Sequence, residues 1–223
     1  MVAQKVVLIT GSSLGIGAAT ARAFAAKGAT VVITYNLDKS AAEEVAKDCR
    51  RSTKEVLVLH LDVTDTKSIT ACVKKVVQKF KRIDVLVNNA GVIRWKKTRD
   101  QTFDDVAAQI RVNLEGLICM TLVALPYVKH TIINIASTAG KNPHATLAPY
   151  CATKFGVRGF TQTLALEEKK LTIYSVNPGV TATRMTDFEG VPPEVVADVI
   201  VNAASGKYRL PSGSDIDVSE YAK

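Results

Sequence analysis

The first thirty residues hold the feature that most limits how this chain can fold. Residues 6–10 (VVLIT) form an almost continuous apolar run that ends at Gly11. Such a run is typical of a strand that is buried on both faces of a parallel sheet. Residues 18–26 are rich in alanine and predict a helix, with Gly28 as its C-cap. A strand, a tight turn and a helix in this order make a corner that can bind phosphate.

Glycines occupy three positions of that turn, at Gly11, Gly15 and Gly17. They allow a pyrophosphate to approach the backbone, and the positive end of the helix dipole favours its charge. The spacing differs from the common G-x-G-x-x-G pattern. A glycine turn can also simply join a strand to a helix, so the motif gains weight from its place between the two.

Strands and helices continue to alternate along the chain. Apolar runs predict further strands at 30–35, 56–61, 85–87, 131–136, 171–176 and 215–218. Helical spacing predicts helices at 39–50, 65–80, 103–125, 150–168 and 195–204. We therefore expect an α/β fold: a single doubly wound Rossmann-type domain over residues 1–223, with a parallel sheet of about seven strands and helices on both faces.

Polar or glycine residues follow several predicted strands at the point where each strand ends. They are Gly11, Asp62, Asn88, Ser137 and Asn177. Each alone can be a turn former. Ligands of open α/β sheets bind outside the carboxyl ends of the strands, so we expect a substrate site at this edge.

Tyr150 and Lys154 lie four residues apart in a segment with helical apolar spacing. This places them one turn apart on the same helix face. An ammonium beside a phenol favours the phenolate and lowers the pKa of the phenol. A tyrosine tuned in this way can act as a general acid or base. The alternative is a half-buried tyrosine beside a solvated lysine.

The ordered set of these motifs resembles the short-chain dehydrogenase/reductase family over nearly the whole chain. Asn113 precedes Ser137 by 24 positions, and Ser137 precedes Tyr150 by 13. The motifs that carry the resemblance are Thr10-Gly11-x3-Gly15-Ile16-Gly17, Asp62-Val63, Asn88-Asn89-Ala90-Gly91, Asn113, Ser137, Tyr150-x3-Lys154 and Pro178-Gly179.

The resemblance implies a single NAD(P)-binding domain. Its glycine turn would hold the pyrophosphate, Asp62 and Val63 would meet the adenine, and the segment after Pro178 would hold the nicotinamide. The cofactor-binding residues implied are Gly11, Ser13, Leu14, Gly15, Ile16, Gly17, Tyr35, Asn36, Asp62, Val63, Asn89, Ala90, Gly91, Tyr150, Lys154, Pro178, Gly179, Val180, Thr181 and Thr183.

The resemblance also implies an oxidoreductase that moves a hydride between the nicotinamide and a carbonyl or secondary alcohol. Ser137 would donate a hydrogen bond to the substrate oxygen, and Tyr150 would exchange a proton with it. Lys154 would lower the pKa of Tyr150 and bind the ribose. Asn113 would hold a water that relays protons from Lys154 to solvent.

The end of the second predicted strand bears on the choice of cofactor. An acidic residue there would bind the ribose of NAD and repel the 2′-phosphate of NADP. Tyr35 occupies this position, which favours NADP over NAD, with Lys39 or Arg22 as phosphate partners. Leu14 stands where a basic residue of the glycine turn would support NADP, and Asp38 can still turn back toward a ribose.

Charge and cysteine content restrict the partners. The chain carries 29 Lys and Arg against 21 Asp and Glu, spread over many segments with no recognition-helix or RNA-binding pattern. We therefore expect no nucleic-acid partner. The four cysteines include no C-x-x-C pair and the three histidines do not cluster, so we expect neither a metal site nor a disulfide framework.

No signal peptide is apparent, because the chain runs directly into the first strand. The longest apolar run, 116–128, contains Pro126 and is too short to cross a bilayer. We expect a soluble cytoplasmic protein with no membrane partner.

The substrate is less constrained, apart from the expectation of a small molecule. The segment 184–194 is short, so we expect only a small lid over the site. His144, Trp95 and Arg94 are interpreted as ordinary loop surface. One alternative is a 3-oxoacyl-(acyl-carrier-protein) reductase whose acidic carrier docks on the basic loop Arg94, Lys96, Lys97 and Arg99. Another is a non-catalytic dinucleotide-sensing protein, although such proteins usually lose the Tyr/Lys pair.

The apolar faces of the helices at 103–125 and 150–166 exceed what one domain can bury. The family pairs these helices between subunits. We therefore expect a homodimer or homotetramer.

Overall fold

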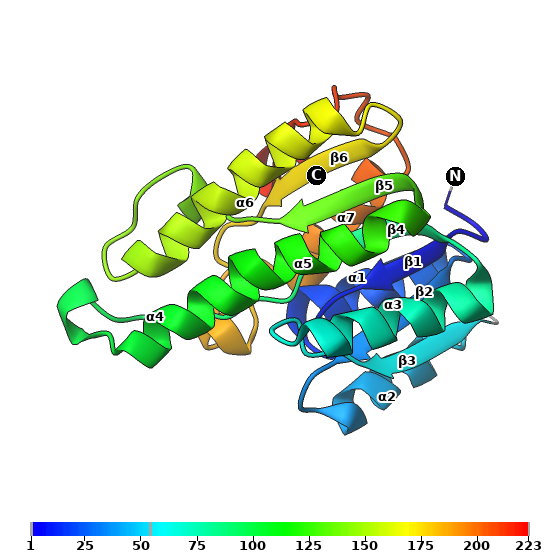
Figure 1. Cartoon of the computed structure of the whole chain (residues 1–223), viewed down its shortest axis with the longest axis horizontal. Helices are drawn as coiled ribbons and strands as arrows, with labels where there is room; N and C mark the ends of the chain where they lie inside the picture. Colours follow the sequence, from blue (N-terminus) through cyan, green and yellow to red (C-terminus); the bar gives the residue numbers. More distant parts are fainter. Residues whose placement is uncertain (1, 54, 223) are drawn as a thin grey trace.

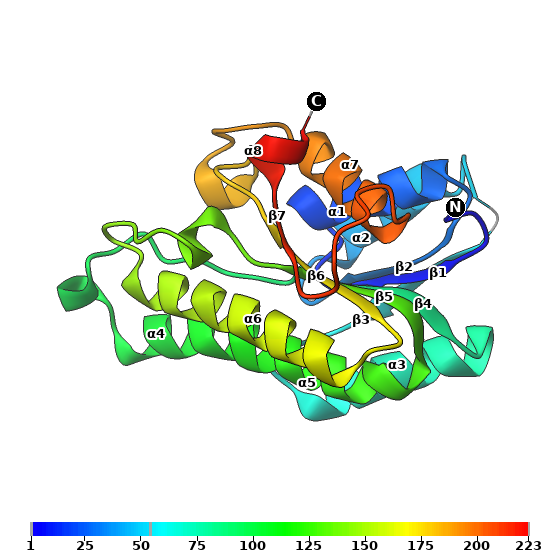
Figure 2. The same cartoon turned by 90° about the horizontal axis from the view of Figure 1, so that it is seen from above.

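Seven parallel strands form one sheet in the computed structural model, which describes residues 2–53 and 55–222. The strands lie side by side in the order β3, β2, β1, β4, β5, β6, β7 (β1 to β6 are labelled in Figure 1 and β7 in Figure 2). The strand order reverses between β1 and β4, and ligands bind at such a switch point. The strands are β1 (Val6–Ile9), β2 (Thr30–Tyr35), β3 (Val56–His60), β4 (Ile83–Asn88), β5 (Val128–Ile135), β6 (Thr172–Asn177) and β7 (Asp215–Asp217).

Helices cover both faces of this sheet, which confirms the predicted doubly wound α/β fold (Figure 2). On one face lie α1, α2 and α7, and on the other lie α3, α5 and α6. The helices are α1 (Gly15–Ala26), α2 (Lys39–Cys49), α3 (Thr66–Phe80), α4 (Phe103–Ile110), α5 (Gly116–Ala124), α6 (Ala148–Glu167), α7 (Pro193–Ala204) and α8 (Val218–Tyr221).

The central strand β1 shows why its sequence is apolar throughout. Val7 and Ile9 pack in the core beneath α1 and α7, whereas Val6 and Leu8 pack in the core beneath α3 and α5. Successive side chains of a strand point to opposite faces, so a strand covered on both faces needs apolar residues at every position.

The helices α2 and α3 both begin after an aspartate that caps them. The Asp38 carboxylate accepts a hydrogen bond from the Ala41 amide at the start of α2, and Asp65 accepts one from Lys67 at the start of α3. Asp65 therefore caps α3. Gly28 follows α1 with a φ of +77°, a left-handed conformation that glycine adopts at little cost.

The long helix expected at 103–125 is not regular. A π-helical turn, Arg111–Glu115, separates α4 from α5, and a 3₁₀ turn, Leu125–Tyr127, follows α5. A π turn holds one more residue than an α turn, and such turns are frequent at functional sites. Asn113 lies in this turn.

The stretch Phe103–Tyr127 is long and apolar enough to cross a membrane by length and composition, and one third of its most apolar window is buried. The helix that contains most of the apolar run 116–128 is thus longer than that run. Core helices of soluble proteins meet the same criterion, and here Met120 and Ala124 of α5 pack among core residues of α3 and the sheet.

Candidate active site

A cavity of about 870 Å³ lies over the carboxyl ends of the strands. It is bounded by the segments that follow β1, β2, β3, β4, β5 and β6 and by the first turns of α6. Most of the predicted site residues line it: Gly11, Ser13, Leu14, Gly15, Ile16, Asn36, Asp62, Val63, Asn89, Ala90, Gly91, Ser137, Tyr150, Lys154, Pro178, Gly179, Val180, Thr181 and Thr183. Gly17, Tyr35 and Asn113 are not among the lining residues.

The glycine turn leaves backbone open at the start of α1. Gly11 and Gly15 have φ values of +62° and +55°. A Cβ at Gly17 would lie 2.4 Å from the Gly11 carbonyl oxygen, so Gly17 lets the helix pack against the strand instead of lining the cavity. Bare backbone at a helix N-terminus is the arrangement that a dinucleotide pyrophosphate requires, and these residues fit that group.

Asn89 and Thr10 tie this turn to β4. The Asn89 side-chain amide donates to the Thr10 and Gly11 carbonyl oxygens at 2.9 and 3.0 Å. The Thr10 hydroxyl accepts hydrogen bonds from the Asn89 and Ala90 amides at 2.9 and 3.0 Å. The predicted pyrophosphate and adenosine segments are thus one hydrogen-bonded unit.

Ser137 and Tyr150 meet at the opposite end of the cavity. Ser137 caps the 3₁₀ turn Thr138–Gly140 after β5, and its hydroxyl accepts a hydrogen bond from the Ala139 amide at 3.1 Å. Tyr150 lies in the first turn of α6 and is 8% exposed. Burial raises the pKa of Tyr150 to about 12, although a hydrogen bond with Ser137 acts in the opposite direction.

Lys154 lies one helical turn further along α6. Its ammonium donates to the Ile135 carbonyl oxygen at 2.8 Å and lies 5.5 Å from the centre of the Tyr150 ring. Burial lowers the pKa of Lys154 to about 8. Desolvation of the phenolate outweighs the hydrogen bond with Ser137, so the net effect is a raised pKa of Tyr150, and the expectation that Lys154 lowers this pKa stays a prediction. Tyr150 is therefore a neutral phenol, ready to donate its proton.

Asn113 holds backbone instead of facing the cavity. Its side-chain oxygen accepts from the Val92 amide at 2.7 Å, and its nitrogen donates to the Val92 carbonyl at 2.8 Å. The nitrogen also donates to Thr153 of α6 at 3.3 Å. Asn113 thus joins the loop after β4 to α6 near Lys154, and its proton relay through water stays a prediction.

The adenosine end shows how the residues after β2 are arranged. Tyr35 packs edge-on against His60, with ring centres 5.6 Å apart, and does not reach the cavity. Asp38 does line the cavity, while its carboxylate caps α2. Arg22, proposed above as a phosphate partner, instead pairs with Asp48 at 3.0 Å.

The substrate end has an apolar wall. Leu147, Ile93 and Tyr150 belong to one apolar cluster, and all three line the cavity. The indole nitrogen of Trp95 donates to the Met185 carbonyl oxygen at 3.0 Å, which joins the loop after β4 to the lid. The predicted lid is a compact loop with one turn, Arg184–Thr186, and a bridge between Thr181 and Val191.

The interpretation of two residues as loop surface is wrong, because Trp95 and His144 both line the cavity. Arg94 does not line it and pairs with Asp105 at 3.3 Å. Leu147 was missed, although it precedes Tyr150 by three positions and this spacing puts both on one face of α6. Met185 was missed because no local pattern shows how a lid folds.

The chain is similar in sequence to a known protein family and to several characterised proteins. A family model described as short chain dehydrogenase matches residues 5–190. A 3-oxoacyl-(acyl-carrier-protein) reductase of Synechocystis sp. is 39% identical and aligns over 82% of this chain and 76% of its own length. A reductase of the same name from Thermotoga maritima is 36% identical over 96% of each chain. A trans-4-hydroxycyclohexanecarboxylate dehydrogenase of Sinomonas cyclohexanicum is 34% identical over 97% of this chain and 92% of its own.

Solved structures of short-chain dehydrogenases have the same fold as this chain. A short chain dehydrogenase from Burkholderia cenocepacia in complex with NADP is 28% identical, with a TM-score of 0.91 over 97% of this chain and 96% of that chain. The family match covers most of the chain, and the expected serine, tyrosine and lysine meet in the cavity. The chain belongs to the short-chain dehydrogenase/reductase family and is an NAD(P)-dependent oxidoreductase that acts on CH–OH and C=O groups.

Proposed function

We propose that the protein is an NADP-preferring oxidoreductase for small, largely apolar ketones and the matching secondary alcohols. The observation that carries this proposal is the wall beside the Tyr150 hydroxyl. Ile93 and Leu147 pack with Tyr150 in one apolar cluster there, and Trp95 and Met185 also line the cavity. An apolar wall of this kind binds apolar substituents and leaves the hydroxyls of a polyol without partners.

The basic loop does not alter this character. Lys96 and Arg94 both pair with Asp105, at 2.7 and 3.3 Å, and neither lines the cavity. Two ionisable residues that line the cavity adjoin this wall in sequence: Arg184 directly precedes Met185, and His144 precedes Leu147 by three positions.

The catalytic groups supply a proton and an orientation. When bound, the nicotinamide cofactor supplies or accepts the hydride. Ser137 donates a hydrogen bond to the carbonyl oxygen, and Tyr150 donates its proton to the same oxygen. Lys154 then stabilises the resulting phenolate while it is an ammonium, below pH about 8.

The cofactor preference follows from the end of β2. Tyr35 holds the position at which a carboxylate would exclude a 2′-phosphate, and the Asp38 carboxylate already caps α2. Lys39 lies beside Asp38 and is exposed, which supports a 2′-phosphate nearby. A related NADP-dependent 3-hydroxy acid dehydrogenase of Schizosaccharomyces pombe is 33% identical over 89% of this chain.

A substrate panel followed by absorbance of the reduced nicotinamide tests both parts. We expect kcat/KM for cyclic or branched apolar ketones to exceed that for polyhydroxy ketones by about tenfold or more. NADPH should be preferred over NADH, and Asp38→Asn should widen the preference. Equal or better use of polyhydroxy ketones contradicts the substrate class, and a clear preference for NADH contradicts the cofactor assignment.

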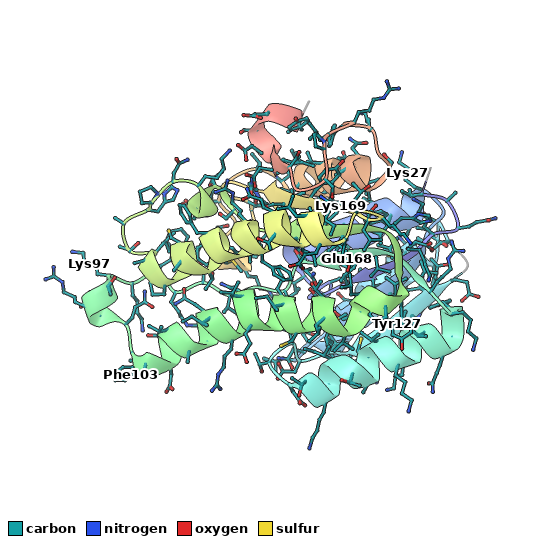
Figure 3. The ribbon with its side chains drawn as sticks, turned by 45° about the horizontal axis from the view of Figure 1, so that its top comes forward. Lys27, Lys97, Phe103, Tyr127, Glu168 and Lys169 are labelled. Atoms are coloured by element: carbon teal, nitrogen blue, oxygen red, sulfur yellow. The ribbon has the colours of Figure 1, made fainter. Side chains whose placement is uncertain are left out.

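Reduction of 3-oxoacyl groups on an acidic carrier is the second candidate. Two relatives with that name are 39% and 36% identical. Lys97 and Arg99 form no ion pair within the described part of the chain, and Lys97 points away from the body of the protein (Figure 3). Replacing both by glutamate should then raise KM for the carrier-bound thioester and leave KM for a free thioester unchanged. Equal effects on both thioesters contradict carrier docking.

Two exposed apolar faces support a homodimer or homotetramer. Leu122 of α5 and Leu166 of α6 are 69% and 68% exposed, and Phe155 of α6 is also exposed. Phe103 stands at the outer end of α4 (Figure 3). Paired helices of a second copy would remove these side chains from water.

A further inference from the structure

A third polar side chain continues the row formed by Tyr150 and Lys154. Arg158 follows Lys154 by four residues on α6, so the three side chains lie on one helix face. Arg158 does not line the cavity, and its side chain is 19% exposed. The reaction needs no guanidinium at this place, so Arg158 has a role other than contact with the substrate.

Arg158 joins the turn after Ser137 to the last strand. One guanidinium nitrogen donates to the Gly140 carbonyl oxygen at 2.6 Å. Two others donate to both carboxylate oxygens of Asp215 on β7, at 3.0 and 2.6 Å. Such a two-point pair is stronger and more directional than a single hydrogen bond. Burial acts to raise the pKa of Asp215, but hydrogen bonds from Arg158 and Asn177 outweigh it and lower that pKa.

A second carboxylate on β7 holds the neighbouring loop. Asp217 accepts a hydrogen bond from the Asn177 side-chain amide at 2.8 Å and pairs with Lys141. Asn177 ends β6 and directly precedes Pro178 and Gly179, which line the cavity. Lys141 follows the turn that Ser137 caps. Both loops beside Tyr150 are therefore fastened to the same short strand.

These pieces have little room to shift. A Cβ at Gly140 would lie 2.7 Å from the Lys154 carbonyl oxygen. The Thr138 amide donates to the Pro178 carbonyl oxygen at 2.9 Å, and the Ser137 hydroxyl lies 3.4 Å from that oxygen. A change in the position of β7 would thus be transmitted to Ser137.

We propose that Arg158, Asp215 and Asp217 form a clamp that fixes Ser137 and the nicotinamide-side loop relative to Tyr150, with Arg158 as a positioning residue. The clamp explains why a strand of three residues at the sheet edge carries two inward-facing carboxylates. Misplacement of a catalytic group by about 1 Å can cost about a hundredfold in rate. The clamp therefore acts on kcat more than on cofactor affinity.

Arg158→Met, with Arg158→Lys as the conservative variant, tests the clamp. We expect Arg158→Met to lower kcat about tenfold or more. The dissociation constant of the reduced cofactor, measured by fluorescence, should stay within about twofold, because the glycine cradle is untouched. Arg158→Lys should recover part of kcat. Asp215→Asn removes the charge but keeps the shape, and should lower kcat less than Arg158→Met.

Arg82→Met is the matched control. Arg82 also pairs with a buried carboxylate, Asp84, at 2.8 Å, but at the amino end of β4, away from the cavity. The Arg82→Met variant should have a lower melting temperature and a kcat near that of the unmodified protein. Equal losses of kcat in Arg158→Met and Arg82→Met, or an unchanged kcat in Arg158→Met, would overturn the clamp.

Hydrogen exchange by mass spectrometry separates this proposal from the proposed substrate class. Residues 138–142 and 178–181 should exchange faster in Arg158→Met than in Arg82→Met, whichever substrate the enzyme uses. Unchanged exchange in both segments would contradict the clamp even if the substrate class is correct. A failed substrate panel with faster exchange would leave the clamp standing and reject the substrate class.

Discussion

Tyr150 and Lys154 show at the scale of single residues how burial prepares a site. Both lie almost entirely out of water, and burial moves their pKa values toward the neutral forms, to about 12 and about 8. The four-residue spacing was enough to predict that they share a helix face. It was not enough to predict their pKa values, because residues far away in the sequence, such as Ile93 beside Tyr150 and Ile135 beside Lys154, help to bury them.

Lys154→Met should stabilise the protein while abolishing turnover. The pKa of Lys154 lies near 8 in the folded protein against a usual 10.5, so unfolding takes up a proton between these pH values. The cost of the buried ammonium is fully present below pH 8 and fades as the pH rises toward 10.5. After loss of the hydrogen bond to Ile135, we expect a net gain of about 2 kcal/mol at pH 7.

Denaturant unfolding of the two proteins at pH 7 and pH 10 measures this effect. The gain should be larger at pH 7 than at pH 10. A gain that does not depend on pH, or a loss at pH 7, would show that Lys154 is not held at a cost in stability.

Whole elements were easier to predict than their interruptions. The Tyr150 helix, β2 and the order of strands and helices follow from apolar spacing, and the structure confirms them. The π turn around Asn113 was not predicted, because it depends on hydrogen bonds to Val92 rather than on local spacing. β4 begins at Ile83, two residues earlier than expected, because Asp84 is buried and accepts a hydrogen bond from the Val6 amide at 2.8 Å.

The first turn of α1 packs closely against the glycine turn at Gly17. Gly17→Ala should destabilise the protein, because its Cβ would meet the Gly11 carbonyl oxygen at 2.4 Å. We expect a cost of about 3 kcal/mol from this overpacking. Gly159→Ala in α6 is the matched control, because a Cβ there meets nothing within 4 Å. It should stabilise the protein by about 0.5–1 kcal/mol through higher helix propensity.

Thermal unfolding of the two alanine variants checks both signs at once. Gly17→Ala should also weaken binding of the reduced cofactor, and Gly159→Ala should not. Equal melting temperatures for the two variants would contradict the close contact between the glycine turn and α1.

The whole molecule exposes apolar side chains in two regions: the cavity, and the outer faces of α5 and α6. Trp95 and Met185 surround the cavity, whereas Leu122 and Leu166 lie on the outer faces of α5 and α6. The sequence predicted the outer faces from an excess of apolar residues. It did not predict the cavity wall, because that wall is assembled from a loop, a lid and a helix start.

Leu122→Glu tests the predicted assembly. It places a charge in the expected contact between copies, so the mass measured by light scattering should fall toward that of the monomer. Phe188→Glu, at an equally exposed apolar side chain on the lid, should leave the mass unchanged. A monomeric unmodified protein would contradict the predicted dimer or tetramer.

We propose that Tyr150 transfers the proton, whereas the glycine turn at the start of α1 holds the cofactor. Tyr150→Phe removes only the hydroxyl, and the most direct measurement is its turnover beside its affinity for the reduced cofactor. We predict that turnover falls by about a thousandfold or more, while the dissociation constant of the cofactor stays within about threefold. Turnover near that of the unmodified protein would show that Tyr150 does not transfer the proton.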